Sequence, residues 1–285
     1  MKLNLDEITF VIVTYKSESV IRQCLDTLPK QSKKIIVENS GNINLEKELK
    51  IKYDNIEVIM SKNNGMGAGN NIGLKSCKTN YAYVLNPDTK LNKDTLSKLF
   101  EELDKITDFT LASPINDNPK IPNFKQSEIN ENNIDILSVD RIDGFSMLFN
   151  LKKFPERLFF DENFFLYLEN DDLCLRVKRK GELIFIIKNS LISHLGGISK
   201  NDKLEFLRNW HWMWSKFYFN KKNFSFLKAL AVITPNVLSS LLKYIFYSIF
   251  KSSFKRKIYE MRLQGSINSI IGKKSFLRLE NIKTR

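Results

Sequence analysis

Cysteine and histidine are scarce in this sequence, which has three cysteines and two histidines among its 285 residues. Cys24, Cys77 and Cys174 lie far apart and form no CxxC pair, which argues against a disulfide framework and against a zinc site. Such cysteine usage is typical of a reducing compartment. The N-terminus, MKLNLDEITF, also lacks a charged segment followed by a long apolar run, so we expect no signal peptide and a cytoplasmic location.

The glycine spacing of a dinucleotide-binding loop is also missing, although residues 63–75 read NNGMGAGNNIGLK. That loop needs glycines at fixed offsets so that its backbone can approach a pyrophosphate at a helix N-terminus. Counted from Gly65 or Gly67, the third glycine position holds Asn70 or Ile72 instead. This argues against a typical NAD site, and the plain alternative is a glycine-rich turn in which asparagines tolerate positive φ.

Acidic residues are nearly absent from residues 200–285, and the net charge of +13 arises there. This part holds 18 of the 45 basic residues but only 4 of the 32 acidic ones, whereas residues 1–199 are close to neutral. Such a basic block predicts an anionic partner, either nucleic acid or an acidic membrane surface.

The first half of the chain alternates short β-rich runs with helical ones. This alternation is typical of an α/β fold in which helices flank a mostly parallel sheet. We expect strands at residues 8–15, 33–40, 56–61 and 81–86 and in FTLASPI, and helices in SVIRQCLDTL, NLEKELKIKY, residues 71–76 and KDTLSKLFEELDKI.

Residues 116–138 are polar and contain prolines, as expected for a surface excursion before the sheet resumes. After it we expect a strand at 141–150, a loop and helix over 159–181 that Gly181 ends, and a last strand in ELIFIIKN that runs to SHLGG. The sequence therefore predicts one α/β domain over residues 1–200 and a helical extension over 201–285.

Asp88, in VLNPDTKL, is the first candidate for chemistry. It follows an apolar strand, and parallel sheets hold their ligands at the carboxyl ends of their strands. Together with the side-chain oxygen of Asn86, Asp88 can ligate a divalent cation that is bound to a diphosphate. The alternative is an ordinary Asn-Pro-Asp turn.

Glu169 and Asp172, in YLENDDLCLRVKRKG, are three residues apart and therefore share one face at the start of a helix. A helix N-terminus favours the ionised carboxylate, so we expect Glu169 to be an anion that accepts a proton as a general base. The alternative is a solvated acidic first turn. His194 ends a strand just before Gly196 and Gly197, and is either a metal ligand or a structural histidine.

The order of these segments resembles glycosyltransferase family 2, in the branch that contains bacterial rhamnosyltransferases. The segments are VTYKS, VENSG, NNGMGAGNNIG, LNPD, DGFSML, FFLYLENDDLCLR and SHLGG, which cover about residues 8–200. The resemblance implies a GT-A fold and an inverting enzyme of surface polysaccharide assembly. Such an enzyme takes a sugar from a nucleotide-sugar donor to a lipid-linked or polysaccharide acceptor. The sequence leaves the donor sugar, the nucleobase and the linkage open, and the resemblance to this branch makes dTDP-rhamnose the first candidate donor.

The resemblance also implies roles for individual residues. Asp88 and His194 correspond to ligands of a divalent metal, Mg²⁺ or Mn²⁺. Glu169 corresponds to the catalytic base, with Asp172 as its orienting or acceptor-binding neighbour. The residues implied to bind the donor or to line the sugar and acceptor crevice are Thr14, Tyr15, Glu38, Asn39, Ser40, Asn64, Gly65, Gly67, Asn71, Asn86, Asp143 and Gly144.

Three positions depart from the pattern of the family. Asn86 replaces the first acid of its DxD metal motif, Glu38 stands where aspartate is usual, and Asn170 replaces the second acid of a Glu-Asp pair. Since Asn86 and Asn170 each remove an acid, the alternative function is a GT-A domain that binds sugar nucleotide or membrane without turnover. A nucleotidyltransferase would need a basic glycine-rich loop after the first strand, which VTYKSESV does not provide.

The C-terminal block combines aromatic and basic residues. EFLRNWHWMWSKFYFNKKNF places Trp210, Trp212 and Trp214 among lysines, a composition typical of a membrane interface. The apolar run at 229–250 is interrupted by a proline, an asparagine and a lysine, which disfavours a transmembrane span. We therefore expect this run to lie on an anionic membrane surface, and no nucleic-acid partner because no binding motif is present. Helices packed back on the catalytic domain are the alternative, and the sequence leaves the oligomeric state open.

Overall fold

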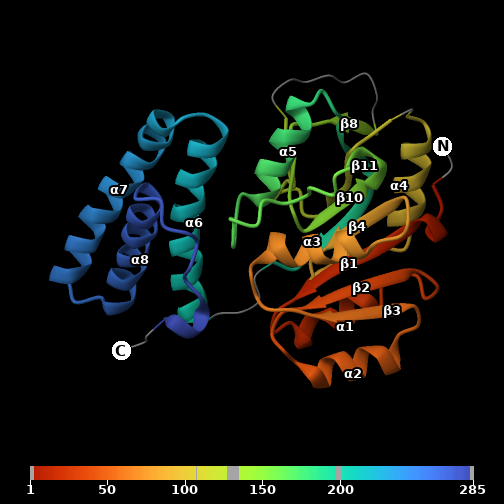
Figure 1. The fold of residues 1–285 in the computed structure, drawn as a ribbon, viewed down its shortest axis with the longest axis horizontal. Helices are drawn as coiled ribbons and strands as arrows, with labels where there is room; N and C mark the ends of the chain where they lie inside the picture. The colour runs from red at the N-terminus through yellow and green to blue at the C-terminus, as the bar shows by residue number, and fades with distance from the viewer. Residues whose placement is uncertain (1–2, 107, 127–134, 197–200, 283–285) are drawn as a thin grey trace. The chain divides into compact units, whose positions relative to one another are not determined.

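The chain folds into two compact units in a computed structural model that describes residues 3–106, 108–126, 135–196 and 201–282 (Figure 1). The first unit comprises Met1–Asp161 and Leu173–Gly196, and the second comprises Glu162–Asp172 and Gly197–Arg285. The division falls inside helix α5 (Glu169–Arg179), so the first turn of that helix belongs to the second unit. No change in composition marks Glu162–Asp172 as part of this unit.

The first unit is built on a sheet with the strand order β3-β2-β1-β4-β10-β6-β11-β5, in which β8 also pairs with β11. Its strands are β1 (Ile8–Thr14), β2 (Lys33–Glu38), β3 (Ile56–Met60), β4 (Tyr81–Leu85), β5 (Thr89–Leu91), β6 (Leu111–Asn116), β8 (Ile136–Ser138), β10 (Ser146–Asn150) and β11 (Ile184–His194). The neighbours among β1 to β4 pair in parallel, as the alternation predicts. In contrast, β10 runs antiparallel to both β4 and β6, so the whole sheet is mixed.

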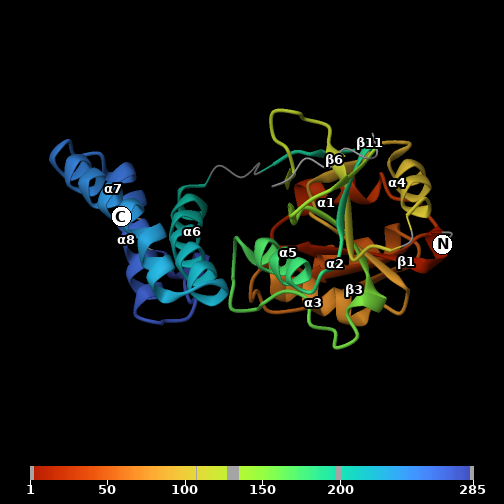
Figure 2. The ribbon, with the colours of Figure 1, turned by 90° about the horizontal axis from the view of Figure 1, so that it is seen from above.

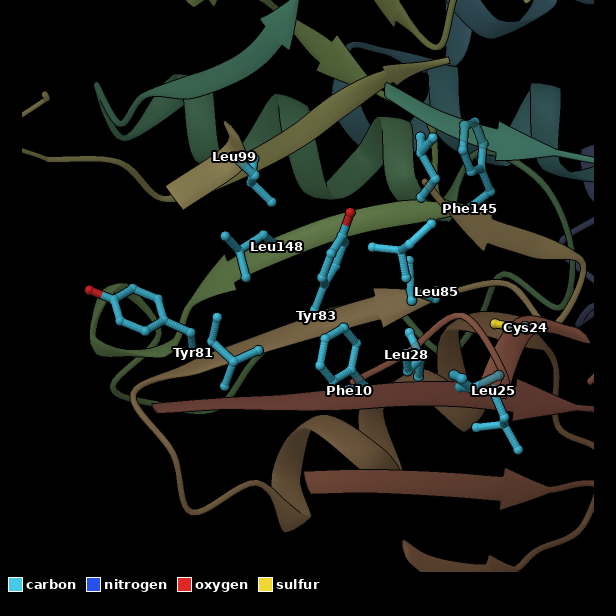
Figure 3. Close-up of a cluster of buried hydrophobic side chains, with 14 of the residues drawn as sticks. Phe10, Cys24, Leu25, Leu28, Tyr81, Tyr83, Leu85, Leu99, Phe145 and Leu148 are labelled. Carbon is cyan, nitrogen blue, oxygen red and sulfur yellow. The ribbon is translucent and has the colours of Figure 1, made fainter. Parts of the chain in front are cut away.

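Alternate side chains of each strand form two cores, one on each face of the sheet. In β1, Phe10 belongs to the first core and Val11 to the second. Across the first core, Phe10 lies in register with Tyr83 of β4, and Tyr83 with Leu148 of β10 (Figure 3). Burial on both faces explains why these strands are continuous apolar runs.

Helices cover both cores (Figures 1 and 2). The first core receives side chains of α1 (Glu18–Leu25), α2 (Ile43–Lys52) and α4 (Thr95–Asp104). The second core receives side chains of α3 (Met66–Ser76) and of α5. The sheet therefore has helices on both faces, as the sequence predicts, and its strand ends are left to carry polar side chains.

Helix α3 begins at Met66, whereas we expected it near Asn71, and this corrects the interpretation of residues 63–75 as mainly a loop. A Cβ atom at Gly73 would lie 2.4 Å from Val11 Cγ1. The glycine thus allows α3 to pack closely on β1, and this tertiary contact overrides the low helix propensity of glycine.

The segment after β6 also differs from the expectation. Residues 127–134 of the predicted excursion lie outside the described residues, and the described part includes β7 (Phe124–Lys125). The single strand expected at 141–150 is divided into β9 (Arg141–Ile142), which pairs with β7, and β10. A turn at residues 143–145 separates them and is part of the site described below.

The described residues of the second unit include three long helices, α6 (Asp202–Asn223), α7 (Phe226–Ile249) and α8 (Ser253–Ile270). Trp210 and Trp214 are only 1% and 3% exposed, in a core shared with Phe165 and Met261. The expectation that the tryptophans face a membrane interface is therefore wrong for these two, because residues four apart share one helix face and here that face is buried. Trp212 is 41% exposed.

Exposed apolar side chains gather instead on α7. Those between 43% and 76% exposed include Leu227, Leu238, Leu241, Leu242, Ile245, Phe246 and Ile249. Among the described helices, α7 is the one long and apolar enough to cross a membrane, and 17% of its most apolar 18-residue window is buried. Length and composition alone do not distinguish such a span from a helix that lies flat on a surface.

Candidate active site

Asp88 and His194 come together at the end of β11. The antiparallel pairing of β5 with β11 sets His194 opposite Thr89. His194 Nε2 consequently lies 3.3 Å from Asp88 Oδ1, and the two side chains remain 24% and 17% exposed. The N–H of Leu195 donates to the Asp88 carbonyl at 3.1 Å, which holds the two segments together. Two predicted metal ligands that are far apart in sequence are thus neighbours in the fold.

The turn at residues 143–145 lies against this pair. The Phe145 ring stacks on the His194 imidazole with ring centres 4.2 Å apart. The Asn86 N–H donates to the Phe145 carbonyl at 2.9 Å, and Asp143 and Gly144 precede Phe145 in the turn. Sequence reasoning missed Phe145, because an aromatic residue in an apolar run gives no sign of its stacking partner.

Glu38 is fully buried at the end of β2, and its carboxylate is bound by groups of its own chain. The Thr14 hydroxyl donates to Oε2 at 2.6 Å, and the Ser40 N–H donates to Oε1 at 2.5 Å. The Ser40 hydroxyl and the Asn42 N–H also donate to Oε1. Glu38 therefore ties the ends of β1 and β2 together, and its extra methylene relative to aspartate lets it reach both.

Two amide oxygens, those of Asn39 and Asn70, are buried without a hydrogen-bond partner among the described residues. Asn39 follows β2, and its N–H donates to the Thr14 carbonyl at 2.8 Å. Asn70 lies in α3. A buried polar group without a partner costs about 1–3 kcal/mol, so such groups are expected where a ligand supplies the missing donor.

The remaining predicted donor-binding residues fall into different places. Tyr15 follows β1, and its N–H donates to Ser17 Oγ at 3.2 Å. Asn64 and Gly65 precede α3, where Gly65 is the N-cap with a φ of 111°, and Gly67 lies in the first turn.

Asn71 has a structural role in the described geometry. Its amide donates to the Phe160 carbonyl and accepts from the Phe160 N–H, both at 2.9 Å. This pair of bonds anchors α3 to the chain that precedes the second unit. A predicted donor contact of Asn71 would have to coexist with both bonds.

Glu169 is the first residue of α5, within the second unit. Its Oε2 atom is buried without a hydrogen-bond partner among the described residues. The pKa of Glu169 is raised from 4.5 to about 7, mainly by burial and to a lesser degree by the nearby Asp171 carboxylate, while a backbone hydrogen bond opposes the shift. Desolvation therefore outweighs the effect of the helix N-terminus, so that near pH 7 Glu169 is an anion in only part of the molecules.

Asp172, one helical turn after Glu169, is completely buried. Lys222 Nζ lies 2.8 Å from its Oδ1 and 2.9 Å from its Oδ2, and the Asn223 amide donates to Oδ1 at 2.9 Å. These contacts favour the orienting role predicted for Asp172 over direct contact with an acceptor. Lys222 and Asn223 were missed from the sequence, since fifty residues separate them from Asp172.

Helix α6 also holds the residues that lead into Glu169. The Ser215 hydroxyl donates to the Leu166 carbonyl at 2.8 Å. The Tyr167 ring packs edge-on against Trp212 with ring centres 5.5 Å apart. The start of α5 is thus built onto α6, and the second unit contains the predicted base.

The donor set of Asp88 and His194 fits a divalent cation in part. A carboxylate oxygen and an imidazole nitrogen are both ligands of Mn²⁺, and because both side chains are partly exposed, positions remain for diphosphate oxygens and water. No group of three or more histidine, cysteine or acidic residues suited to a metal occurs within the described ranges. The pair can therefore anchor a cation that a diphosphate also binds.

Two hollows of the described residues lie away from this site. One hollow of about 530 Å³ is lined by residues that include Leu5, Leu91 and Phe100, and another of about 280 Å³ includes Lys34 and Tyr53. Neither lining includes a predicted site residue. The candidate site is located by strand ends and by the contacts of its side chains.

Known proteins resemble this chain in sequence. The profile of Glycosyl transferase family 2 matches residues 9–174. The low-salt glycan biosynthesis hexosyltransferase Agl10 of Haloferax volcanii is 26% identical over 201 residues, which are 62% of this chain and 63% of that protein. Glycosyltransferase GlyA of Streptococcus pneumoniae is 27% identical over 105 residues, which are 34% of this chain and 15% of that protein. The chain thus spans less than two thirds of the length of these curated relatives.

Solved structures resemble its fold. The mannosyltransferase PcManGT of Pyrobaculum calidifontis, in complex with GDP-Man and Mn²⁺, has a TM-score of 0.58 at 10% identity and covers 94% of this chain and 88% of that chain. GalNAc-T7 with UDP, GalNAc and Mn²⁺ has a TM-score of 0.56 at 12% identity, and the match covers 81% of this chain and 57% of that chain. S. aureus TarS 1-349 has a TM-score of 0.53 at 14% identity, and the match covers 94% of this chain and 92% of that chain. At such low identities the likeness concerns the fold alone, and it confirms the predicted GT-A class.

Proposed function

Because the chain belongs to glycosyl transferase family 2, we propose that it moves a sugar from a nucleotide-sugar donor to an acceptor hydroxyl in a single inverting displacement. The observation that carries this proposal is Glu169, whose Oε2 is buried without a partner among the described residues and whose pKa is about 7. A carboxyl group with a pKa near the working pH is well suited to general-base catalysis.

In this reaction Glu169 removes the proton of the acceptor hydroxyl while the oxygen attacks the anomeric carbon. The bond between that carbon and the diphosphate oxygen breaks, and its electron pair leaves with the nucleoside diphosphate. Attack from the face opposite the leaving group inverts the anomeric carbon, and the transition state has oxocarbenium-ion character.

Asp88 and His194 would hold Mg²⁺ or Mn²⁺, with Asn86 as a neutral oxygen donor close by. When bound, the cation neutralises charge that develops on the departing diphosphate. The 3.3 Å approach of the two side chains supports this assignment. The Mn²⁺ in two structures of similar fold supports it as well.

The donor is tested with a panel of nucleotide sugars. dTDP-rhamnose is our first candidate, and UDP-glucose, UDP-GlcNAc and GDP-mannose complete the panel, because similar folds were solved with GDP-Man or UDP. A donor present at a hundred times its Kd should stabilise the protein by about 2.7 kcal/mol, which raises Tm by several degrees in the presence of Mn²⁺.

Asp88→Asn and His194→Gln should each reduce this metal-dependent increase in Tm. Nucleoside diphosphate released on incubation with candidate acceptors separates turnover from binding. Stabilisation without any release would favour the alternative of a sugar-nucleotide-binding domain without turnover. An unchanged Tm with every donor, with and without metal, would contradict the proposal.

The acceptor we propose is a lipid-linked glycan, reached from an anionic membrane surface. The apolar side chains at 238, 241, 242, 245, 246 and 249 recur at helical spacing and are 43–70% exposed. The surplus of basic residues in residues 200–285 surrounds them in sequence. An apolar face with basic surroundings is typical of a helix that lies in the interface of an anionic membrane.

Flotation with liposomes tests this location. The full chain should float with vesicles that contain phosphatidylglycerol and much less with pure phosphatidylcholine vesicles. Leu242→Asp/Ile249→Asp should reduce binding by about tenfold or more, since each change removes an exposed apolar side chain and adds a repelled charge. The control, Gln31→Asp/Asn118→Asp, adds the same charge at exposed positions of the first unit. Equal loss in both variants would exclude a specific role of α7.

A further inference from the structure

The end of α6 holds the start of α5 through a buried ion pair. Asp172 is 0% exposed, and both of its carboxylate oxygens lie within 2.9 Å of Lys222 Nζ. Asn223 adds a bond to Oδ1 at 2.9 Å. A buried carboxylate is strongly destabilising when a partner is removed, so we expect this contact to help hold the first turn of α5 in place.

The backbone just before Glu169 needs such an anchor. Tyr167 and Leu168 have φ values of 71° and 67°, a conformation that side chains other than glycine rarely adopt. Each such residue costs of order 1 kcal/mol and persists only where its surroundings enforce it. The surroundings here are α6, through Ser215 and Trp212 before Glu169 and through Lys222 after it.

We propose that Lys222 and Asn223 are positioning residues, which hold Asp172 and thereby the first turn of α5 so that the Glu169 carboxylate keeps its orientation toward the acceptor. This inference rests on the proposed function of Glu169 as the base. It assigns part of the catalytic apparatus to the C-terminal helices, at positions outside the family match at residues 9–174.

The ion pair of Asp172 and Lys222 also places charge one helical turn from Glu169. Asp171 is the ionisable group that acts on Glu169, and Asp172 with its partner Lys222 lies one helical turn further along α5. Glu205 and Arg208 of α6 act on Tyr167. Replacing the Lys222 ammonium by a neutral group removes one positive charge from beside Asp172. A like charge disfavours ionisation of a carboxyl group, so the pKa of Glu169 should rise further.

The test compares Lys222→Met, which keeps the aliphatic stem, with Lys222→Arg, which keeps the cation. Lys257→Met is the matched control, since Lys257 makes a 2.8 Å ion pair with Glu260 on α8 of the same unit. Release of nucleoside diphosphate is measured with Mn²⁺ and the nucleotide sugar that the unmodified protein turns over. Amide hydrogen exchange of residues 166–172 is measured on all four proteins.

In Lys222→Met we expect kcat to fall about 10–100-fold, as a small misplacement of a catalytic group produces, with the KM for the donor unchanged. The acid limb of the pH profile of kcat should move to higher pH, which a mere loss of folded protein would not cause. Lys222→Arg should restore kcat to within about threefold, and Lys257→Met should match the unmodified protein.

Two outcomes overturn the proposal. The first is that Lys222→Met has a normal kcat and a normal pH profile while Glu169→Gln is inactive. This result would contradict the positioning role but leave the proposed function of Glu169 intact. The second is unchanged exchange of residues 166–172 in Lys222→Met. Hydrogen exchange needs no substrate, so it tests the positioning role even if the protein turns over no donor. Absence of turnover with every donor would count against the proposed function, not against the positioning role.

Discussion

At the scale of single residues, the sequence predicts some properties of Glu169 but not others. Its place at a helix start and its spacing from Asp172 could be predicted from local pattern alone. Its pKa could not, because burial depends on segments that lie far away in the chain. Asp88 and His194 illustrate the same limit, since only the pairing of β5 with β11 brings them to 3.3 Å.

The raised pKa of Glu169 predicts a pH-dependent gain in stability for Glu169→Gln. The folded state holds the proton up to about pH 7, whereas the unfolded chain loses it near pH 4.5. Stability from this group is therefore present below about pH 4.5 and is lost as the pH rises to 7. Glutamine is neutral and has nearly the shape of the protonated carboxyl group, so its contribution to stability does not change over this pH range.

We expect the variant to match the unmodified protein at pH 4.5 and to exceed it by about 1–3 kcal/mol in free energy of unfolding at pH 8. Urea denaturation at the two pH values measures the difference. A gain of equal size at both pH values would show that burial does not raise this pKa.

At the scale of elements, the strand and helix types of the first unit follow from hydrophobic pattern, and the exceptions have physical causes. Helix α3 begins earlier than propensity predicts, because glycine at position 73 is required for close packing on β1. The antiparallel direction of β10 was not predictable, since a long connection leaves either direction open. Tryptophan burial in α6 was misjudged because composition does not show which helix face is covered.

A double-mutant cycle tests the packing of α3. Gly73→Ala should destabilise the protein by about 1–3 kcal/mol, since its Cβ would lie 2.4 Å from Val11 Cγ1. Val11→Ala removes that methyl group and should on its own cost about 1–3 kcal/mol by leaving a cavity. The double variant should lose clearly less free energy of unfolding than the sum of the losses in the two single variants. Strictly additive free energies in urea denaturation would mean that the helix approaches the strand less closely.

At the scale of the whole molecule, composition divides the chain near residue 200, whereas its contacts assign Glu162–Asp172 to the second unit as well. This assignment could not be predicted, because it depends on tertiary contacts such as those of Lys222 and Ser215. Its consequence is that the proposed base and the exposed helix α7 belong to the same unit. Removing the C-terminal helices is therefore expected to abolish catalysis as well as membrane binding.

The central claim is that Glu169 is the base of a sugar transfer, and the turnover of Glu169→Gln tests it most directly. With the identified donor, Mn²⁺ and acceptor, we expect kcat to fall by about 10²–10⁴-fold, the usual contribution of a general base, while the Kd for the donor stays within about threefold. A Glu169→Gln protein that binds donor and turns it over at the rate of the unmodified protein would contradict the account.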